Sequence, residues 1–345
     1  MISKNKEKRF FGNKLRFRTY PYTAVRVLAM KSLLLKKEDY MKMQKMGINE
    51  TTRFLEERHY KKEIDALSKG FRGIELINLA LNASIAHDVN KLLRISINEE
   101  VKNMIKLYSN KWVVNNLKII IRVKINRLDK EFIHYGIIPI APTTHGFCIT
   151  LYNADEKTMA KEIEKILPID ADEFLDFYRK SDLTSIENML DKQYYNMLYE
   201  ASKNVKSKII KEFLQNLVEL INIRNVVKLK ISDIDKKIIE DFVIGDKGSV
   251  ITKLLEGDIK DVLEKSKYSA LAEGIEKDPA NLENNIENFL LQYSSKLLHS
   301  KSMSISPIFG YLLAKEIEVR NLGLLINSKI SGLEEEFIEK NLIMV

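Results

Sequence analysis

Along most of the chain, apolar side chains recur every three or four residues, which is the spacing of amphipathic helices. The first such stripe, in residues 24–46, consists of Val27, Leu28, Met30, Leu34, Leu35, Tyr40, Met43 and Met46. Further amphipathic segments cover roughly 52–64, 74–96, 99–108, 110–125, 156–167, 171–178, 182–202, 204–230, 235–243, 248–255, 258–274, 280–299 and 306–329. No segment alternates apolar and polar residues for long enough to predict a sheet. The pattern therefore predicts an all-α protein in which residues 134–150 form an irregular connector.

The composition agrees with a helical fold. Glycine and proline number 13 and 6 among 345 residues, about half of the usual share for this pair. So few helix-breaking residues disfavour a turn-rich β architecture and the glycine-rich loops of nucleotide-binding folds. The length would suit two or three domains of about 100–150 residues.

The basic residues of the chain are concentrated in an N-terminal arm, residues 1–20. This arm holds seven cations against Glu7 alone, so it carries +6 of the total net charge of +8. The body of the protein is therefore nearly neutral, which disfavours a dedicated nucleic-acid binder. We interpret the arm as a solvated tail; contact with anionic lipid headgroups, contact with nucleic acid, or a short targeting presequence are the alternatives.

The single cysteine, Cys148, excludes a disulfide within the chain and a zinc site built on cysteines. A reducing compartment is the natural environment for such a chain. The longest apolar stretches fall far short of the roughly 18–20 residues that a membrane-spanning helix needs. We therefore expect a protein that does not span a membrane.

The chain contains an internal repeat of nine residues. The segments Asn116–Lys124, Asn222–Lys230 and Asn321–Lys329 each have Asn at the first position, aliphatic residues one, four and five positions later, and Lys eight positions later. A second motif, Ile-Glu-Asn followed by two apolar residues, occurs at 186–190 and again at 286–290. Two motifs in one order at one period predict a chain of three related units.

The spacing between the two motifs suggests the limits of the units. Leu190 precedes its Asn by 32 residues and Leu290 by 31, whereas the weaker match Phe54-Leu55 precedes Asn116 by 61. The first unit is therefore expected to carry an inserted helical pair at about 70–105. The predicted organisation is an arm at 1–20 and repeat units at 21–130, 131–235 and 236–345.

On a helix, the Asn and Lys of the repeat lie on the same stripe as the aliphatic residues, because each residue turns the helix by 100°. An amide inside an apolar stripe must find hydrogen-bond partners. We expect the Asn to tie its helix to a neighbouring helix end within the repeat, while the Lys reaches toward the rim. The alternative is that the Lys ammonium lines a cavity that meets a partner.

The ordered set of motifs across the chain is similar to one known family. It begins with Tyr22-x-Ala24-x-Arg26-Val27-x-Ala29-Met30-Lys31-Ser32 and Asp39-Tyr40, continues in residues 112–124, Glu187-Asn188-x-Leu190-Asp191, Tyr194-Tyr195 and residues 222–230, and ends with Pro307-x3-Tyr311-x3-Lys315-Glu316-x-Glu318-x2-Asn321-Leu322 and Lys329-x-x-Gly332-Leu333. From about Tyr22 to the C-terminus the chain resembles the C subunit of archaeal and bacterial A/V-type rotary ATPases, the counterpart of the d subunit of the eukaryotic V-ATPase.

This resemblance implies an all-helical funnel of three similar units about a pseudo-threefold axis. Its central cavity would receive the end of the rotor shaft, made by the D and F subunits, and its base would stand on the membrane ring of proteolipid subunits. The chain would be a non-catalytic subunit without a cofactor, at the cytoplasmic face of the membrane, and would transmit torque for proton or sodium ion transport coupled to ATP hydrolysis or synthesis. The alternative is a generic helical-repeat adaptor of another assembly.

Cations of the repeat are the candidate contacts with acidic residues of the shaft. They are Arg122, Lys124, Lys228, Lys230 and Lys329.

Motifs of catalysis are absent from the sequence. No phosphate-binding G-x4-G-K-[ST] loop occurs, and residues 245–249 read as a turn or a helix start. His134 and His145 share the connector with Cys148, but no metal-binding spacing occurs. Glu316 and Glu318 would not face each other on a helix, which argues against paired acid–base chemistry.

Overall fold

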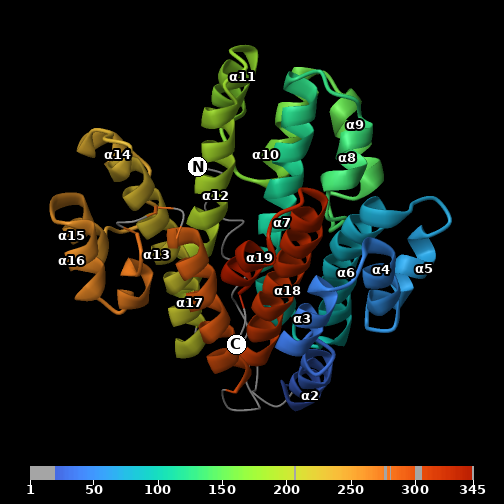
Figure 1. Cartoon of the computed structure of the whole chain (residues 1–345). Helices are drawn as coiled ribbons and strands as arrows, with labels where there is room; N and C mark the ends of the chain where they lie inside the picture. Colours follow the sequence, from blue (N-terminus) through green and yellow to red (C-terminus); the bar gives the residue numbers. More distant parts are fainter. Residues whose placement is uncertain (1–19, 206, 276–277, 280, 300–304, 344–345) are drawn as a thin grey trace.

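The computed structural model describes residues 20–205, 207–275, 278–279, 281–299 and 305–343. The basic arm that the sequence analysis singled out therefore lies, up to residue 19, outside the described residues. Within these ranges the regular elements are eighteen α-helices and one 3-10 helix, with no strand (Figure 1). The prediction of an all-α protein is confirmed.

Six helices in the described ranges are long and follow one another in pairs. They are α6 (Gly73–Ile95) with α7 (Glu99–Ile125), α12 (Leu183–Asn204) with α13 (Lys208–Ile231), and α17 (Asn281–Leu298) with α18 (Ser306–Ile330). Each of these helices packs on the next in this order, and α18 packs back on α6. The six long helices thus form a closed circuit, and the repeated Asn and Lys lie near the C-terminal ends of α7, α13 and α18.

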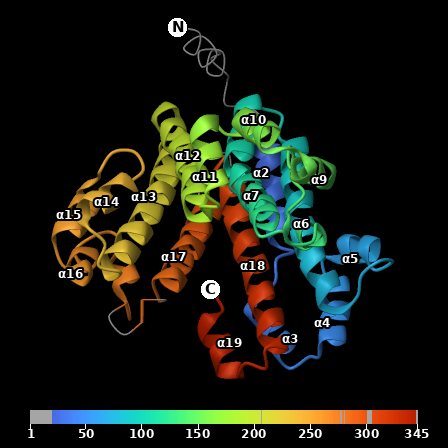
Figure 2. The same ribbon diagram turned by 90° about the horizontal axis from the view of Figure 1, so that it is seen from above.

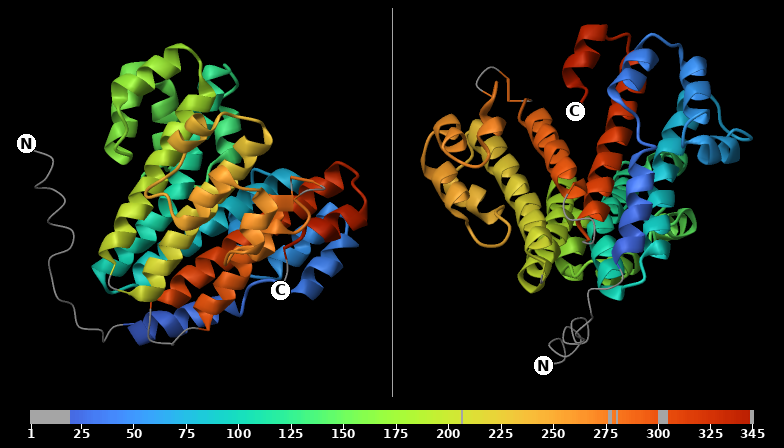
Figure 3. Two further views of the ribbon diagram at one scale, coloured as in Figure 1. Left: turned by 90° about the vertical axis from the view of Figure 1, so that its left-hand side faces the viewer. Right: turned by 90° about the horizontal axis from the view of Figure 1, so that it is seen from below.

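An aromatic cluster holds α7, α13 and α18 together in their N-terminal halves. The ring centroids of Tyr108, Phe213 and Phe309 lie 5.3–5.9 Å from one another, and all three side chains are buried. Each such aromatic pair stabilises the fold by about 0.5–1.5 kcal/mol beyond the effect of burying the rings. From this end the long helices spread apart, as α17 and α18 do most clearly (Figure 2 and Figure 3).

Short helices precede the first long pair, lie between the pairs and follow the last one. They are α2 (Tyr20–Lys31), α3 (Lys37–Gln44), α4 (Ile48–Glu56) and α5 (Lys61–Leu67); α8 (Glu131–Gly136), α9 (His145–Asn153), α10 (Glu156–Ile166) and α11 (Ala171–Arg179); α14 (Lys236–Asp241), α15 (Ser249–Glu256), α16 (Ile259–Glu264) and η1 (Ser269–Ala272); and α19 (Glu335–Asn341). Many begin where a side-chain oxygen satisfies a free backbone amide of the first turn, as at Thr144, Asp155, Asp170, Asp235 and Asp258.

Two segments differ from the sequence prediction. The stripe at 24–46 predicted one helix, but the chain breaks between α2 and α3, where the amide of Leu35 donates to Glu318 Oε2 at 2.6 Å instead of continuing the helix. The expected connector at 134–150 includes the helix α9, which Thr144 caps by accepting from the amide of Phe147 at 3.4 Å. A tertiary hydrogen bond ends the helix in the first place, and a side-chain cap starts a helix in the second.

The hydrophobic core joins the two ends of the chain. A separate cluster of buried side chains packs Tyr40, Leu55 and Tyr60 from the N-terminal helices against Leu322 and Leu325 of α18. The last long helix is therefore anchored on the first short helices.

Candidate functional site

The asparagines of the repeat make the same pair of hydrogen bonds in all three places. Asn116 donates to the carbonyl of Ile138 at 2.6 Å and accepts from its amide at 2.9 Å. Asn222 does the same with Ile244, at 2.9 Å for both bonds, and Asn321 with Ile343, at 2.7 and 3.0 Å.

In each case the isoleucine lies 22 residues after the asparagine, just beyond the short helix α8, α14 or α19. All three amides are buried, so these bonds replace water for groups that would otherwise be costly to bury. The structure therefore confirms the expectation that the Asn ties its helix to a neighbouring helix end. We call each of these pairs an asparagine clasp.

The lysines of the repeat also share one role. Lys124 Nζ donates to the carbonyls of Tyr152, at 2.6 Å, and Ala154, at the end of α9. Lys230 Nζ donates to those of Leu254, at 2.7 Å, and Gly257, at the end of α15. An ammonium at a helix C-terminus satisfies free carbonyls and complements the helix dipole.

The third lysine, Lys329, binds the beginning of the chain in the same way, and we call each of these three contacts a lysine clamp. Lys329 Nζ donates to the carbonyls of Gln44 at 2.5 Å and Met46 at 2.7 Å, at the end of α3. Burial lowers the pKa of Lys124 and of Lys329, and the nearby carboxylates Asp155 and Glu335 oppose this effect. Lys124 and Lys230 thus each hold the second short helix after their own motif helix, namely α9 and α15, and Lys329 holds α3 near the beginning of the chain.

The two other candidate cations, Arg122 and Lys228, form ion pairs within the circuit. Arg122 makes two bonds of 2.5 and 2.6 Å to the carboxylate of Glu187 on α12. Lys228 pairs with Glu283 on α17. Both cations are about half exposed, at 51% and 54% of their side-chain area, so they keep a solvent-accessible surface. Their contact with a shaft stays a prediction.

Charged residues at a spacing of four recur along the long helices, and we call these pairs the charge stripes. They are Lys118 and Arg122 on α7, Glu187 and Asp191 on α12, Arg224 and Lys228 on α13, Glu283 and Glu287 on α17, and Glu316 and Arg320 on α18. A spacing of four places both members of a pair on one face of the helix.

The stripes of different helices meet. Lys118 Nζ lies 2.5 Å from Asp191 Oδ2, and Lys228 of α13 pairs with Glu283 of α17. Carboxylates from three helices, Asp191, Glu316 and Glu283, act on the partly buried Tyr195. Loss of contact with water raises the pKa of Tyr195, Arg224 lowers it, and these three carboxylates raise it further. The stripes therefore surround a shared polar region.

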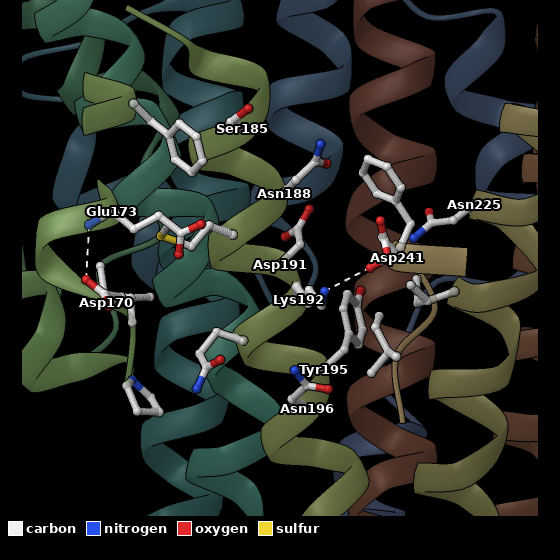
Figure 4. Close-up of a pocket in the computed structure, with 18 of the residues that line it drawn as sticks. Asp170, Glu173, Ser185, Asn188, Asp191, Lys192, Tyr195, Asn196, Asn225 and Asp241 are labelled. Atoms are coloured by element: carbon white, nitrogen blue, oxygen red, sulfur yellow. Dashed lines mark hydrogen bonds between the residues drawn. The ribbon is translucent and has the colours of Figure 1, made fainter. Parts of the chain in front are cut away.

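A cleft of about 710 Å³ opens beside this region, between α11, α12, α13 and α14 (Figure 4). Asp191 and Tyr195 lie on its wall together with Arg224 and Asn225 of α13. Lys192 donates across one side of it to the carbonyl of Asp241 at 2.8 Å. Its lining is mixed in charge, which fits a protein surface better than a small apolar ligand.

A buried ionic cluster, which we call the closing cluster, links α18 to the loop before α5. Lys315 Nζ lies 2.8 Å from His59 Nε2 and 2.9 Å from both the Tyr60 hydroxyl and Glu318 Oε1. Tyr60 donates to the same carboxylate at 2.6 Å. Burial alone would raise the pKa of Glu318, but Lys315, His59 and Tyr60 lower it to about 2.

The sequence analysis missed this cluster and the pair formed by its neighbour Glu316. Glu316 binds Lys111 of α7 and accepts from the Tyr108 hydroxyl at 3.2 Å, beside the aromatic cluster. Glu316 and Glu318 thus point to different partners, as their spacing of two predicted. The spacing of four in the charge stripes was the signal that could have revealed the polar region.

The remaining candidate groups from the sequence analysis are the histidines and the cysteine of residues 134–150. Among the described residues, no cluster of three or more His, Cys, Asp or Glu side chains could hold a metal ion. The rings of His134 and His145 stack at 5.3 Å, and Cys148 is buried, which raises its thiol pKa to about 12. Within the same ranges, no helix combines the length and the apolar character needed to cross a bilayer.

Comparison with known proteins gives one consistent result. A family model described as ATP synthase (C/AC39) subunit matches residues 23–341. The chain is similar to the C subunit of the A-type ATP synthase of Methanococcoides burtonii, with 32% identity over 94% of both chains. It is also similar to the proteins of the same name from Archaeoglobus fulgidus, with 28% identity over 94% of this chain and 96% of the relative, and from Haloferax volcanii, with 27% identity over 94% and 97%.

Proposed function

The chain belongs to the C/AC39 subunit family of ATP synthases, and on this premise we propose that it is a non-catalytic adaptor of the rotor. One end would receive the tip of the rotor shaft, made by the D and F subunits. The opposite end would stand on the membrane ring of proteolipid subunits, at the cytoplasmic face of the membrane. The chain would pass torque between the two, so that ATP hydrolysis or synthesis is coupled to transport of protons or sodium ions.

We propose that three similar units surround a pseudo-threefold axis and form a funnel. The observation that carries this proposal is that the third lysine clamp, made by Lys329, closes on α3 and so repeats at the chain ends what Lys124 and Lys230 do within the chain. The closed circuit of long helices and the aromatic cluster at one end support the same arrangement.

The order of elements suggests limits for the units that differ from those expected from the sequence. We assign α3–α8 to the first unit, α9–α14 to the second and α15–α19 to the third, because each then begins with a clamped short helix and ends with an asparagine clasp. In this assignment α6 is the counterpart of α12 and α17. The region 70–105 would then hold no inserted pair.

The shaft would contact the charge stripes. A torque-bearing contact needs a surface whose charges fix the position of the partner, and complementary charges also exclude incorrect registers. Arg122, Arg224 and Lys228 offer partly exposed cations on two motif helices, α7 and α13. The lysine clamps would instead maintain the shape of the opening, because their ammonium groups are engaged with carbonyls.

The end of the molecule that holds the turn between α6 and α7 and the start of α13 would face the proteolipid ring. Ile97 follows α6 and is 64% exposed, and Ile209 at the start of α13 is 38% exposed. Apolar side chains at the tips of turns are suited to a protein interface with an apolar centre.

Binding of the purified chain to the isolated D–F shaft tests this function. Replacement of Arg122, Arg224 and Lys228 by Glu should weaken binding by about tenfold or more, since three attractive contacts become repulsive. An unchanged affinity, with the fold verified by circular dichroism, would refute the proposed contact.

A matched control carries three charge reversals at exposed lysines away from the stripes, namely Lys161→Glu, Lys237→Glu and Lys253→Glu. It should bind the shaft like the unmodified chain. In parallel, capture of the tagged chain from native membranes should recover the D, F and proteolipid subunits; recovery of none of them would favour an adaptor of another assembly.

A further inference from the structure

The third motif helix, α18, lacks the cations of the other two. Two and six residues after the motif asparagine, α7 and α13 each carry a pair of cations, which are Lys118 and Arg122 on α7 and Arg224 and Lys228 on α13. At the same two positions α18 has Gly323 and Asn327. Residues 321–328 of α18, which we call the neutral sector, contain no charged side chain.

These positions face the same way in all three helices. From the motif asparagine to the sixth residue after it, the order of burial is identical in α7, α13 and α18: two buried residues, two partly buried, two buried and one exposed. Gly323 therefore takes the partly buried place of the first cation, and Asn327 takes the exposed place of the second. The third helix differs from the other two in chemistry and not in orientation.

The carboxylates that face these cations are also missing beside α18. The cations of α7 pair with carboxylates of α12, and Lys228 of α13 pairs with Glu283 of α17. The long helix that follows α18 in the circuit is α6, and residues 76–87 of α6 contain neither Asp nor Glu. Arg320, which precedes the neutral sector, is bound to Asn284 and to the carbonyl of Asn341. The charge stripes are therefore interrupted on one side of the circuit.

The fold itself does not require a glycine at position 323. The φ of Gly323 is not positive, and an added Cβ would meet no atom within 4 Å. Glycine inside a helix is less favourable than alanine, because it loses more backbone entropy on folding. What a glycine permits is the close approach of another backbone. The residue is therefore suited to contact with a group from outside this chain.

We propose that the neutral sector fixes the orientation of the shaft tip in its binding site. An acidic side of the tip faces the cations of α7 and α13, and an uncharged side packs closely on α18 at Gly323 and Asn327. After a third of a turn, the acidic side would meet a helix face without cations, and the uncharged side would cover cations without offering them a charge. This inference rests on the proposed function, because it names the chemistry of the same partner at the same site.

Binding of the full chain to the isolated D–F shaft tests the close contact. Gly323→Leu should weaken binding by about tenfold or more, since the larger side chain occupies space that the shaft needs. The midpoint of thermal unfolding should not fall, because leucine favours the helix and the position is open. Gly323→Arg combined with Asn327→Arg should weaken binding as well, although this variant gains two cations.

The matched control is Gly146→Leu in α9. Gly146 is also a glycine inside a helix, and an added Cβ there also meets no atom within 4 Å. This variant should bind the shaft like the unmodified chain.

Photo-crosslinkers test the orientation. One is placed at Asn327 and another, in a separate variant, at Lys228, and the shaft residues that they join are identified by mass spectrometry. We expect the two positions to join different sides of the shaft tip. The inference is overturned if Gly323→Leu binds like the unmodified chain, if the variant with two arginines binds more tightly, or if both crosslinkers join the same shaft residues. Failure of the unmodified chain to bind the shaft would refute the proposed function and this inference together, whereas the other three results overturn the inference alone.

Discussion

The closing cluster provides a strong test of how the two ends of the chain are joined. Lys315 and Glu318 of α18 expose only 2% and 3% of their side-chain area, and both contact Tyr60 in the N-terminal part of the chain. We expect Lys315→Met to destabilise the protein strongly, because it leaves the buried carboxylate of Glu318 without its cation.

The magnitude follows from the carboxylate. The pKa of Glu318 falls from the ordinary value of 4.5 to about 2, and a difference of about 2.5 pKa units corresponds to roughly 3 kcal/mol of stability at neutral pH. Breaking a buried ion pair by removal of one partner typically costs about 3–5 kcal/mol, which agrees with this value. Lys315→Met should therefore lower the free energy of unfolding by about 3–5 kcal/mol.

The sign of the pH dependence is fixed by the direction of this shift. Because the pKa of Glu318 is lower in the folded state, its contribution is present in full above the unfolded value and is lost as the pH falls from about 4.5 to about 2. The stability difference between the unmodified chain and Glu318→Gln should thus be largest near neutral pH and should lose about half of its value by about pH 3.

Urea unfolding followed by circular dichroism measures both effects. The control is Lys118→Met, whose partner Asp191 is 37% exposed, so the loss there should be about 1 kcal/mol or less. If Lys315→Met costs no more than Lys118→Met, or if the Glu318→Gln difference does not change between pH 7 and pH 3, the cluster does not hold the chain ends together as argued.

Four further substitutions test the packing. Gly310→Ala should destabilise the protein by about 1–3 kcal/mol, since the added Cβ would approach the Ser294 carbonyl of α17 to 2.8 Å. Gly323→Ala on the same helix should stabilise it by about 0.5–1 kcal/mol, because no atom lies within 4 Å of the added Cβ. Thermal unfolding in which both substitutions shift the stability in the same direction would contradict this. Phe213→Ala should lower the free energy of unfolding, measured in urea, by about 3–5 kcal/mol. A decrease below about 1 kcal/mol would show that the aromatic cluster does not hold the long helices together. Lys329→Met should speed amide hydrogen exchange in α3 while exchange in α9 stays unchanged; equal effects on both would show that the clamp is not local.

Much of the fold follows from local patterns in the sequence. The long helices α12, α13 and α18 agree with the predicted segments because their apolar stripes are regular over many turns. The break between α2 and α3 could not be predicted in this way, because the amide of Leu35 is bound by Glu318, which lies far away in the sequence.

The candidate site was predictable only in part. The position of Asn116, Asn222 and Asn321 on an apolar stripe required a buried partner, and each third does contain an isoleucine 22 residues later. The partner group is a backbone amide and carbonyl, however, which every residue possesses and no sequence pattern marks. The partners of Lys124 and Lys329 could not be predicted for the same reason, because which carbonyls they bind depends on where a neighbouring helix ends.

The most direct test of the account is a photo-crosslinker placed at Arg224 in the assembled ATP synthase complex. Arg224 belongs to the charge stripes and lies on the wall of the cleft beside Asp191 and Tyr195. If the charge stripes face the shaft, irradiation should join this position to the D or the F subunit, and the same crosslinker at Lys161 should not form this product. A crosslink to the D or F subunit from Lys161, with none from Arg224, would contradict the proposed binding site of the shaft.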